Sequence, residues 1–200
     1  MILAIDTSTA ACTAALFDDA GNCVAERTEV IGRGHAERLV PMIEELLVGR
    51  TASHILVGVG PGSFTGIRVG IAAAHGLAIG WNAELSGMSS LALLASGTPS
   101  RPIAVAISGG HGELFVQQFD GPRPSSPLVN LNPADAAACT AANLVVGTGA
   151  AALVGARGSG EARDAWPNAA DALKLPLELR TLEPRPLYAR APDARASQAA

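Results

Sequence analysis

Residues 55–78 read ILVGVGPGSFTGIRVGIAAAHGLA, and the main features of the fold can be predicted from them. The apolar run 55–59 has the length and composition of a buried strand. The glycines and the proline after it permit a tight turn, and Ser63 or Thr65 can cap a helix that extends to about Ala78. The sequence therefore predicts a strand, a glycine-rich turn and a helix in succession.

This predicted helix carries a small residue at every fourth position. Gly66, Gly70, Ala74 and Ala78 share one face, so another backbone can approach that face closely. Each glycine costs about 1 kcal/mol of helix propensity relative to alanine, and a close contact must offset that cost. Two explanations are open: the small face packs on the helix's own sheet, or it packs on a partner helix.

The glycine-rich turn matches none of three common motifs for phosphate or nucleophile chemistry. A P-loop needs Lys and Ser/Thr after its last glycine, whereas Ile67 and Arg68 follow Gly66. A dinucleotide fingerprint needs a third glycine where Ser63 stands, and Phe64 with Thr65 disrupts a nucleophile elbow around that serine. The turn by itself therefore indicates no phosphate or acyl chemistry.

The composition is typical of a soluble α/β protein. The 200 residues are 48% hydrophobic but only 4% aromatic. No apolar run approaches the roughly 20 residues of a membrane span, and the N-terminus has no basic leader. Cys12, Cys23 and Cys139 form no C-x-x-C pair, so we expect small buried thiols in a reducing cytoplasm. With a net charge of −4 and one lysine, the chain is expected to contact tRNA only indirectly.

The two parts of the chain repeat one order of elements: a strand, a hairpin strand, a third strand, a helix, a further strand and a glycine turn. The strands are predicted at 2–6, 13–17, 23–28, 55–59 and 84–88, and then at 103–107, 113–119, 128–131 and 143–146. Helices are predicted at 35–48, 63–78, 90–95, from Asn132, and within 161–174. The segment 97–102 is the strongest boundary signal, so we expect halves at 1–99 and 100–191, with a disordered tail at 192–200.

Several motifs resemble those of one known family. MILAIDTSTAACTAAL, GHAERLVPMIEELL, GPGSFTGIRVGIAAAHGLA and PLYAR occur in the order found in the bacterial TsaB family, whose older name is YeaZ. Its members are accessory subunits of the machinery that makes threonylcarbamoyladenosine, the modified adenosine next to the tRNA anticodon. The resemblance covers nearly the whole chain. It departs at 108–111, where the family often has Asp-Ala-Arg, and between about 155 and 184.

The resemblance implies an α/β fold of two duplicated ribonuclease-H-like halves, as in the actin, sugar-kinase and Hsp70 (ASKHA) superfamily, with mixed sheets flanked by helices. It also implies a TsaD-type transferase as partner, a TsaE-type ATPase in the same complex, and a homodimer when the chain is alone. The partner-binding residues expected on the two helices of the first half are His35, Arg38, Leu39, Met42, Ile43, Gly66, Ile67, Gly70, Ile71 and Ala74.

We expect no catalytic residue, no metal and no cofactor in this chain. The catalytic relative of the family carries an H-x-x-x-H metal pair where Ser90 and Leu94 stand here, and leucine cannot bind a metal. Ser108 stands where the second half of a kinase would need an acid. A remnant of a nucleotide site is expected at Asp6, Ser8, Gly147 and Gly149. The alternatives are an ASKHA-type small-molecule kinase or ATPase and an M22-like glycoprotease.

Overall fold

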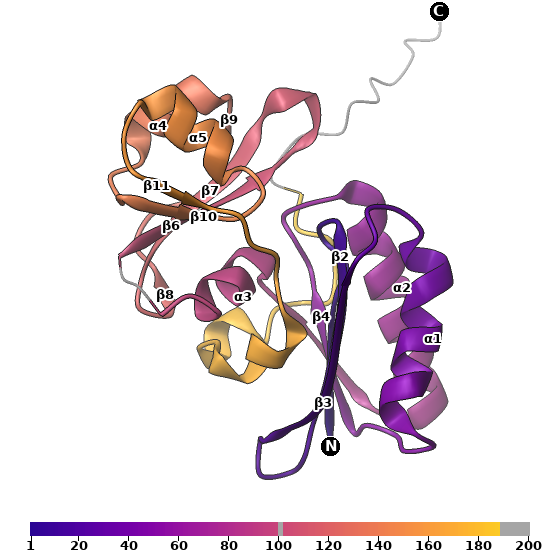
Figure 1. Ribbon diagram of the computed structural model, residues 1–200. Coiled ribbons are helices and arrows are strands. Elements are labelled where there is room, and N and C mark those ends of the chain that lie inside the picture. Colours follow the sequence, from indigo (N-terminus) through magenta and orange to yellow (C-terminus); the bar gives the residue numbers. More distant parts are fainter. Residues whose placement is uncertain (100–101, 189–200) are drawn as a thin grey trace, which may run out of the picture.

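The computed structural model describes residues 1–99 and 102–188, which form two mixed sheets flanked by helices (Figure 1). This arrangement confirms the predicted fold class. The tail predicted at 192–200 lies outside the described residues.

The first sheet has five strands in the order β3-β2-β1-β4-β5. β1 and β2 are antiparallel, as are β2 and β3, whereas β4 runs parallel to both β1 and β5. The bounds are β1 Ile2–Asp6, β2 Ala11–Phe17, β3 Cys23–Val30, β4 His54–Gly58 and β5 Glu84–Met88.

The second sheet repeats this connectivity. Its order is β11-β10-β6-β7-β8, and β9 also pairs with β7. β6 and β7 are antiparallel, as are β7 and β9, whereas β10 runs parallel to β6 and to β11. The bounds are β6 Ile103–Ser108, β7 Leu114–Asp120, β8 Arg123–Pro124, β9 Val129–Leu131, β10 Leu144–Val146 and β11 Glu161–Arg163. The duplicated order of elements predicted from the sequence is thus present in the strand pairing.

Each sheet has a pair of helices on its outer face (Figure 1). α1 and α2 cover the first sheet, α4 and α5 cover the second, and α3 lies between the two sheets. The bounds are α1 His35–Leu47, α2 Phe64–Trp81, α3 Ser90–Ser96, α4 Pro133–Cys139 and α5 Ala150–Arg157, with 3-10 turns η1 Gly110–Gly112, η2 Ala169–Lys174 and η3 Leu177–Leu179. None of the helices in the described ranges combines the length and apolar character needed to cross a bilayer.

The ends and faces of α1 and α2 follow from their sequences. The Ser63 hydroxyl accepts the Gly66 amide at the start of α2, and Asn82 ends that helix in the left-handed conformation. α1 continues through Pro41, although proline has no amide hydrogen to donate within a helix. Pro41 lies on the exposed face of α1, so its ring does not disturb the packing of the opposite, buried face.

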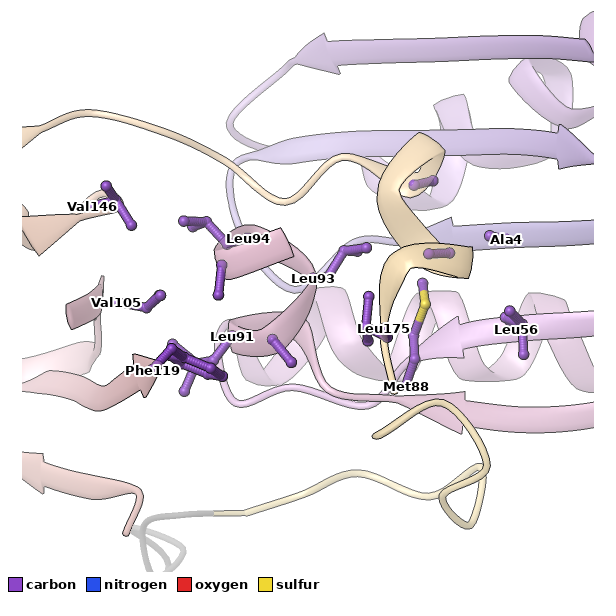
Figure 2. Packing of buried hydrophobic residues seen from close by; sticks show 14 of the residues in the cluster. Ala4, Leu56, Met88, Leu91, Leu93, Leu94, Val105, Phe119, Val146 and Leu175 are labelled. Carbon is purple, nitrogen blue, oxygen red and sulfur yellow. The ribbon is translucent and has the colours of Figure 1, made fainter. Parts of the chain in front are cut away.

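One hydrophobic cluster joins the two halves (Figure 2). α3 lies at its centre, with Ala4 and Leu56 of the first sheet on one side and Val105, Phe119 and Val146 of the second on the other. All five side chains are buried. Because the inner faces of both sheets contribute to this cluster, neither half completes its core alone.

The chain returns to the first sheet after β11. η2 packs against β1, β2 and β3, and the Asn168 side-chain oxygen accepts the Thr28 hydroxyl and the Ala170 amide. Further on, Leu182 pairs with Gly87, and the Leu187 amide donates to the Val59 carbonyl at 2.8 Å. The predicted halves at 1–99 and 100–191 follow sequence order. Residues 165–188 belong to the second of them in sequence but pack on the first.

The helix predicted within 161–174 is present only as a short 3-10 helix. The structure has the short strand β11 there, followed by the 3-10 turn η2. Ala169, Ala172 and Leu175 are all buried, and their spacing of three residues fits the three-residue turn of a 3-10 helix. No helix was predicted at 150–157, where the structure has α5.

Candidate partner-binding surface

The expected remnant of a nucleotide site begins with Asp6 at the end of β1. This carboxylate is 1% exposed. Its Oδ1 accepts the Ser8 amide at 2.8 Å and the Ser8 hydroxyl at 2.7 Å, and its Oδ2 accepts the Ser90 hydroxyl at 2.6 Å. Burial raises the pKa of Asp6, while the bonds from Ser90 and Ser8 oppose that rise. Both carboxylate oxygens therefore accept hydrogen bonds from the protein itself, from the turn after β1 and from the start of α3.

The two glycines expected at the same site, Gly147 and Gly149, also form hydrogen bonds with the protein itself, in the second half. The Gly147 amide donates to the Arg163 carbonyl and the Gly149 amide to the Ala106 carbonyl, both at 2.9 Å. Gly147 has a φ of +115°, and a Cβ there would overlap the Ala106 carbonyl oxygen. The structure brings Asp6 and Ser8 together, but the contacts of Gly147 and Gly149 remain within the second half.

Ser90 and Leu94 stand where the catalytic relative of the family is expected to have its metal-binding histidines. Both residues have structural contacts here. Ser90 is buried, and besides donating to Asp6 its hydroxyl accepts the Gly60 amide at 3.2 Å. Leu94 belongs to the cluster between the sheets. Among the described residues, no group of three His, Cys, Asp or Glu side chains is placed to hold a metal ion.

Asp6→Asn is expected to unfold at pH 7.5 with the same or a larger free energy than wild type. The amide keeps an acceptor for Ser8, can donate to Ser90, and removes a buried charge. Because the folded-state pKa of Asp6 lies above the ordinary 3.8, wild type loses stability as the pH rises through that folded-state pKa. The difference between variant and wild type should therefore grow from pH 4.5 to pH 7.5 in urea titrations.

Asp6→Ala is the matched contrast, because it removes the acceptor of three buried hydrogen bonds and should cost about 1–3 kcal/mol at pH 4.5, and less at pH 7.5, where wild type has lost the stability linked to the Asp6 proton. An Asp6→Asn protein as unstable as Asp6→Ala would show that the fold needs the negative charge.

The small face of α2 packs on its own sheet. Cβ atoms on Gly66 and Gly70 would overlap Thr7, at its carbonyl oxygen and at 2.5 Å from its Oγ1 respectively. The Thr7 hydroxyl also donates to the Gly66 carbonyl at 2.7 Å. Ala74, one turn further on, is fully buried. Of the two explanations that the sequence left open, the structure shows the first.

The other residues expected to bind a partner are mostly buried as well. Six of them are at most 8% exposed and belong to the core of the first half, namely Leu39, Met42, Ile43, Ile67, Ile71 and Ala74. His35 is also buried, and its Nε2 lies 3.3 Å from the Ala11 carbonyl. Arg38 is half-buried and pairs with Glu29 and Glu45. The core or a surface ion pair engages most of each of these side chains in this structure, so they offer a partner little surface.

The exposed side of the same two helices carries apolar side chains among charged ones. Val40 is 43%, Val48 77% and Ile79 83% exposed. A groove of about 310 Å³ runs between the C-terminal parts of α1 and α2; it is lined by Val40, Ile43, Glu44, Leu47, Gly49, Arg50, Leu77 and Trp81. We call these exposed residues and the groove the α1–α2 face.

A second strip of small residues lies on this face. Ala72, Gly76 and Gly80 are exposed at four-residue spacing, and a Cβ on either glycine would meet no atom within 4 Å. Neither this strip nor Ile79 was among the residues expected to bind a partner. The four-residue spacing of Ala72, Gly76 and Gly80 was a signal that could have identified it.

Comparisons with known proteins point to one family. The model of the TsaD family, tRNA N6-adenosine threonylcarbamoyltransferase, matches residues 24–121. The chain is 36% identical over 127 residues to the tRNA threonylcarbamoyladenosine biosynthesis protein TsaB of Escherichia coli, covering 59% of this chain and 54% of that protein. It is 34% identical over 129 residues to TsaB of Haemophilus influenzae, covering 58% and 52%. The matches thus span about half the length of these curated relatives.

The solved structure of YeaZ from Pseudomonas aeruginosa is similar over almost its whole length. It is 30% identical to this chain with a TM-score of 0.78, and the alignment covers 94% of this chain and 98% of that one.

Proposed function

The chain belongs to the TsaB (YeaZ) family, and on this basis we propose that it acts in tRNA threonylcarbamoyladenosine biosynthesis as a non-catalytic subunit that binds a TsaD-type transferase. The observation that carries the proposed partner role is the α1–α2 face. Isolated exposed apolar side chains are common, but here exposed Val40 lines a groove that also contains Leu77 and Trp81, and Val48 and Ile79 are exposed on the same pair of helices.

The open glycines of α2 support a helix as the occupant of this face. Gly76 and Gly80 project no side chain, so a partner helix can lie closer to α2 than larger residues would permit. Ile79, between them in sequence, can then pack beside that helix. A helix in an apolar groove is a common mode of protein recognition.

The contacts of the residues expected at the nucleotide site favour an accessory role over a catalytic one. Asp6 binds Ser8 and Ser90, and Gly147 and Gly149 bind backbone carbonyls. We further propose that a TsaE-type ATPase joins the same complex, that the free chain pairs with a second copy through this face, and that tRNA is reached through the transferase.

The test is co-purification of this chain with its cognate TsaD-type protein, with and without ATP. Ile79→Asp is expected to weaken the association at least tenfold, because a carboxylate would have to be buried without a partner. Its melting temperature should match wild type, since the side chain is 83% exposed.

Val24→Asp is the matched control, because Val24 is 45% exposed on the edge strand β3 and lies outside the α1–α2 face. Failure of the wild-type chain to associate would refute the proposed partner. Association that Ile79→Asp leaves unchanged would show that the partner uses another surface.

A further inference from the structure

Three side chains form a cluster at the N-terminal end of α2. The Arg68 guanidinium carbon lies 3.5 Å from the centre of the Phe64 ring, and Arg68 Nε donates to the Tyr188 hydroxyl at 2.9 Å. The Phe64 and Tyr188 rings have centroids 5.3 Å apart. The last described residue of the chain is thereby fixed beside the first turn of α2.

This cluster leaves the charged end of Arg68 open. Within residues 1–99 and 102–188, no carboxylate pairs with Arg68, and its hydrogen bond to Tyr188 uses only Nε. The two terminal nitrogens of a guanidinium form a planar fork that matches the two oxygens of a carboxylate. Stacking on Phe64 holds the fork in one plane, so little side-chain entropy remains to be lost when an anion binds.

The surroundings of the fork are exposed and apolar. Phe64 is 48% exposed, and Leu187 and Tyr188 are each 44% exposed. Arg68 also shares one face of α2 with the open strip, because Arg68, Ala72, Gly76 and Ile79 follow at helical spacing and are all exposed. The cluster therefore extends the α1–α2 face toward the other end of the helix.

We propose that Arg68, held by Phe64 and Tyr188, receives an acidic side chain from the same partner helix that packs on the α1–α2 face. This inference rests on the proposed function. At a rise of 1.5 Å per residue, Arg68 and Ile79 are about 16 Å apart along α2. A partner helix aligned with α2 therefore carries the acid about eleven residues from its contact with Ile79.

A protein carboxylate fits this site better than an RNA phosphate. RNA binding relies on several cations along the backbone, whereas this chain has a net charge of −4. The apolar side chains beside the fork also favour a folded protein surface. A pairing of this kind adds orientation, because it fixes which way the partner helix runs.

The experiment measures binding of the cognate TsaD-type protein to wild type, Arg68→Gln and Arg68→Lys at two salt concentrations. Arg68→Gln is expected to weaken binding at least tenfold and to reduce its salt dependence, and Arg68→Lys should recover part of the loss. Arg33→Gln, an exposed arginine on the loop before α1, is the control of equal charge and should change binding less than twofold. Changing the matching acid of the partner to its amide should add no further loss to Arg68→Gln.

Several results would overturn the proposal. Equal binding by Arg68→Gln and wild type would refute it alone, whereas no binding by wild type would also refute the proposed function. A lower melting temperature in both Arg68→Gln and Tyr188→Phe, with binding unchanged, would make the cluster only an anchor for the end of the chain. If Arg68→Gln lost tRNA binding but still bound the TsaD-type protein, Arg68 would be an RNA site. If a chain ending at Tyr188 bound the TsaD-type protein more tightly than the full chain, the chain's own last residues would be the occupant.

Discussion

Gly66→Ala is expected to lower the free energy of unfolding by about 3 kcal/mol or more, although alanine is the better helix former. The added Cβ would overlap the Thr7 carbonyl oxygen, which is backbone and cannot turn away. The first turn of α2 would have to move off β1, and the hydrogen bond from the Thr7 hydroxyl to the Gly66 carbonyl would be strained or lost.

Gly76→Ala is the matched control on the same helix. A Cβ at Gly76 meets nothing within 4 Å, so the change should stabilise the protein by up to about 1 kcal/mol. Urea unfolding of both variants at pH 7.5 measures the contrast. If Gly66→Ala were as stable as wild type, α2 would not pack on the turn after β1 as the structure shows.

Gly76→Leu is expected to reduce affinity for the TsaD-type partner at least a hundredfold while leaving the melting temperature within a few degrees of wild type. The leucine would project into the space that the proposed partner helix occupies, and the two backbones could no longer approach. Gly70→Leu should behave in the opposite way. Its side chain would meet Thr7 and Val57 inside the first half, so it should mainly destabilise the fold.

Gly155→Leu provides the control for this second prediction, because Gly155 is exposed in α5 of the other half and also has open space around it. Binding should be unaffected by that change. Calorimetric titration and thermal melting on the same preparations separate the two properties. A Gly76→Leu protein that binds as tightly as wild type would exclude this strip from the partner contact.

Much of the fold was predictable because local patterns determine it. The apolar run 55–59 forms most of β4, and Ser63 caps α2. The repeated order of strands predicted the shared connectivity of the two sheets. These predictions depend on residues close together in sequence. The return of 165–188 to the first sheet depends on contacts such as Asn168 with Thr28, 140 positions apart, which no local pattern reveals.

The partner surface that we propose lies on the two helices named from the sequence, but on their exposed side, because most residues first expected there are buried. α2 carries two strips of small residues, one from Gly66 to Ala74 and one from Ala72 to Gly80, and spacing alone cannot say which strip faces the sheet. The structure decides it through Thr7, whose backbone occupies the space beside the first strip. The Arg68 cluster was not predicted, since Tyr188 lies 120 positions away in the chain.

The core shared by the two halves has a consequence for biosynthesis. As the chain leaves the ribosome, the first sheet is complete once β5 has emerged, yet Ala4 and Leu56 on its inner face still lack α3, and η2 lies some 80 residues further on. α3 follows at once, but the part of the first sheet that η2 covers stays exposed during synthesis of the whole second sheet. Nascent chains arrested at this stage are expected to be prone to aggregation and to recruit a chaperone. The final step of folding must await the synthesis of η2.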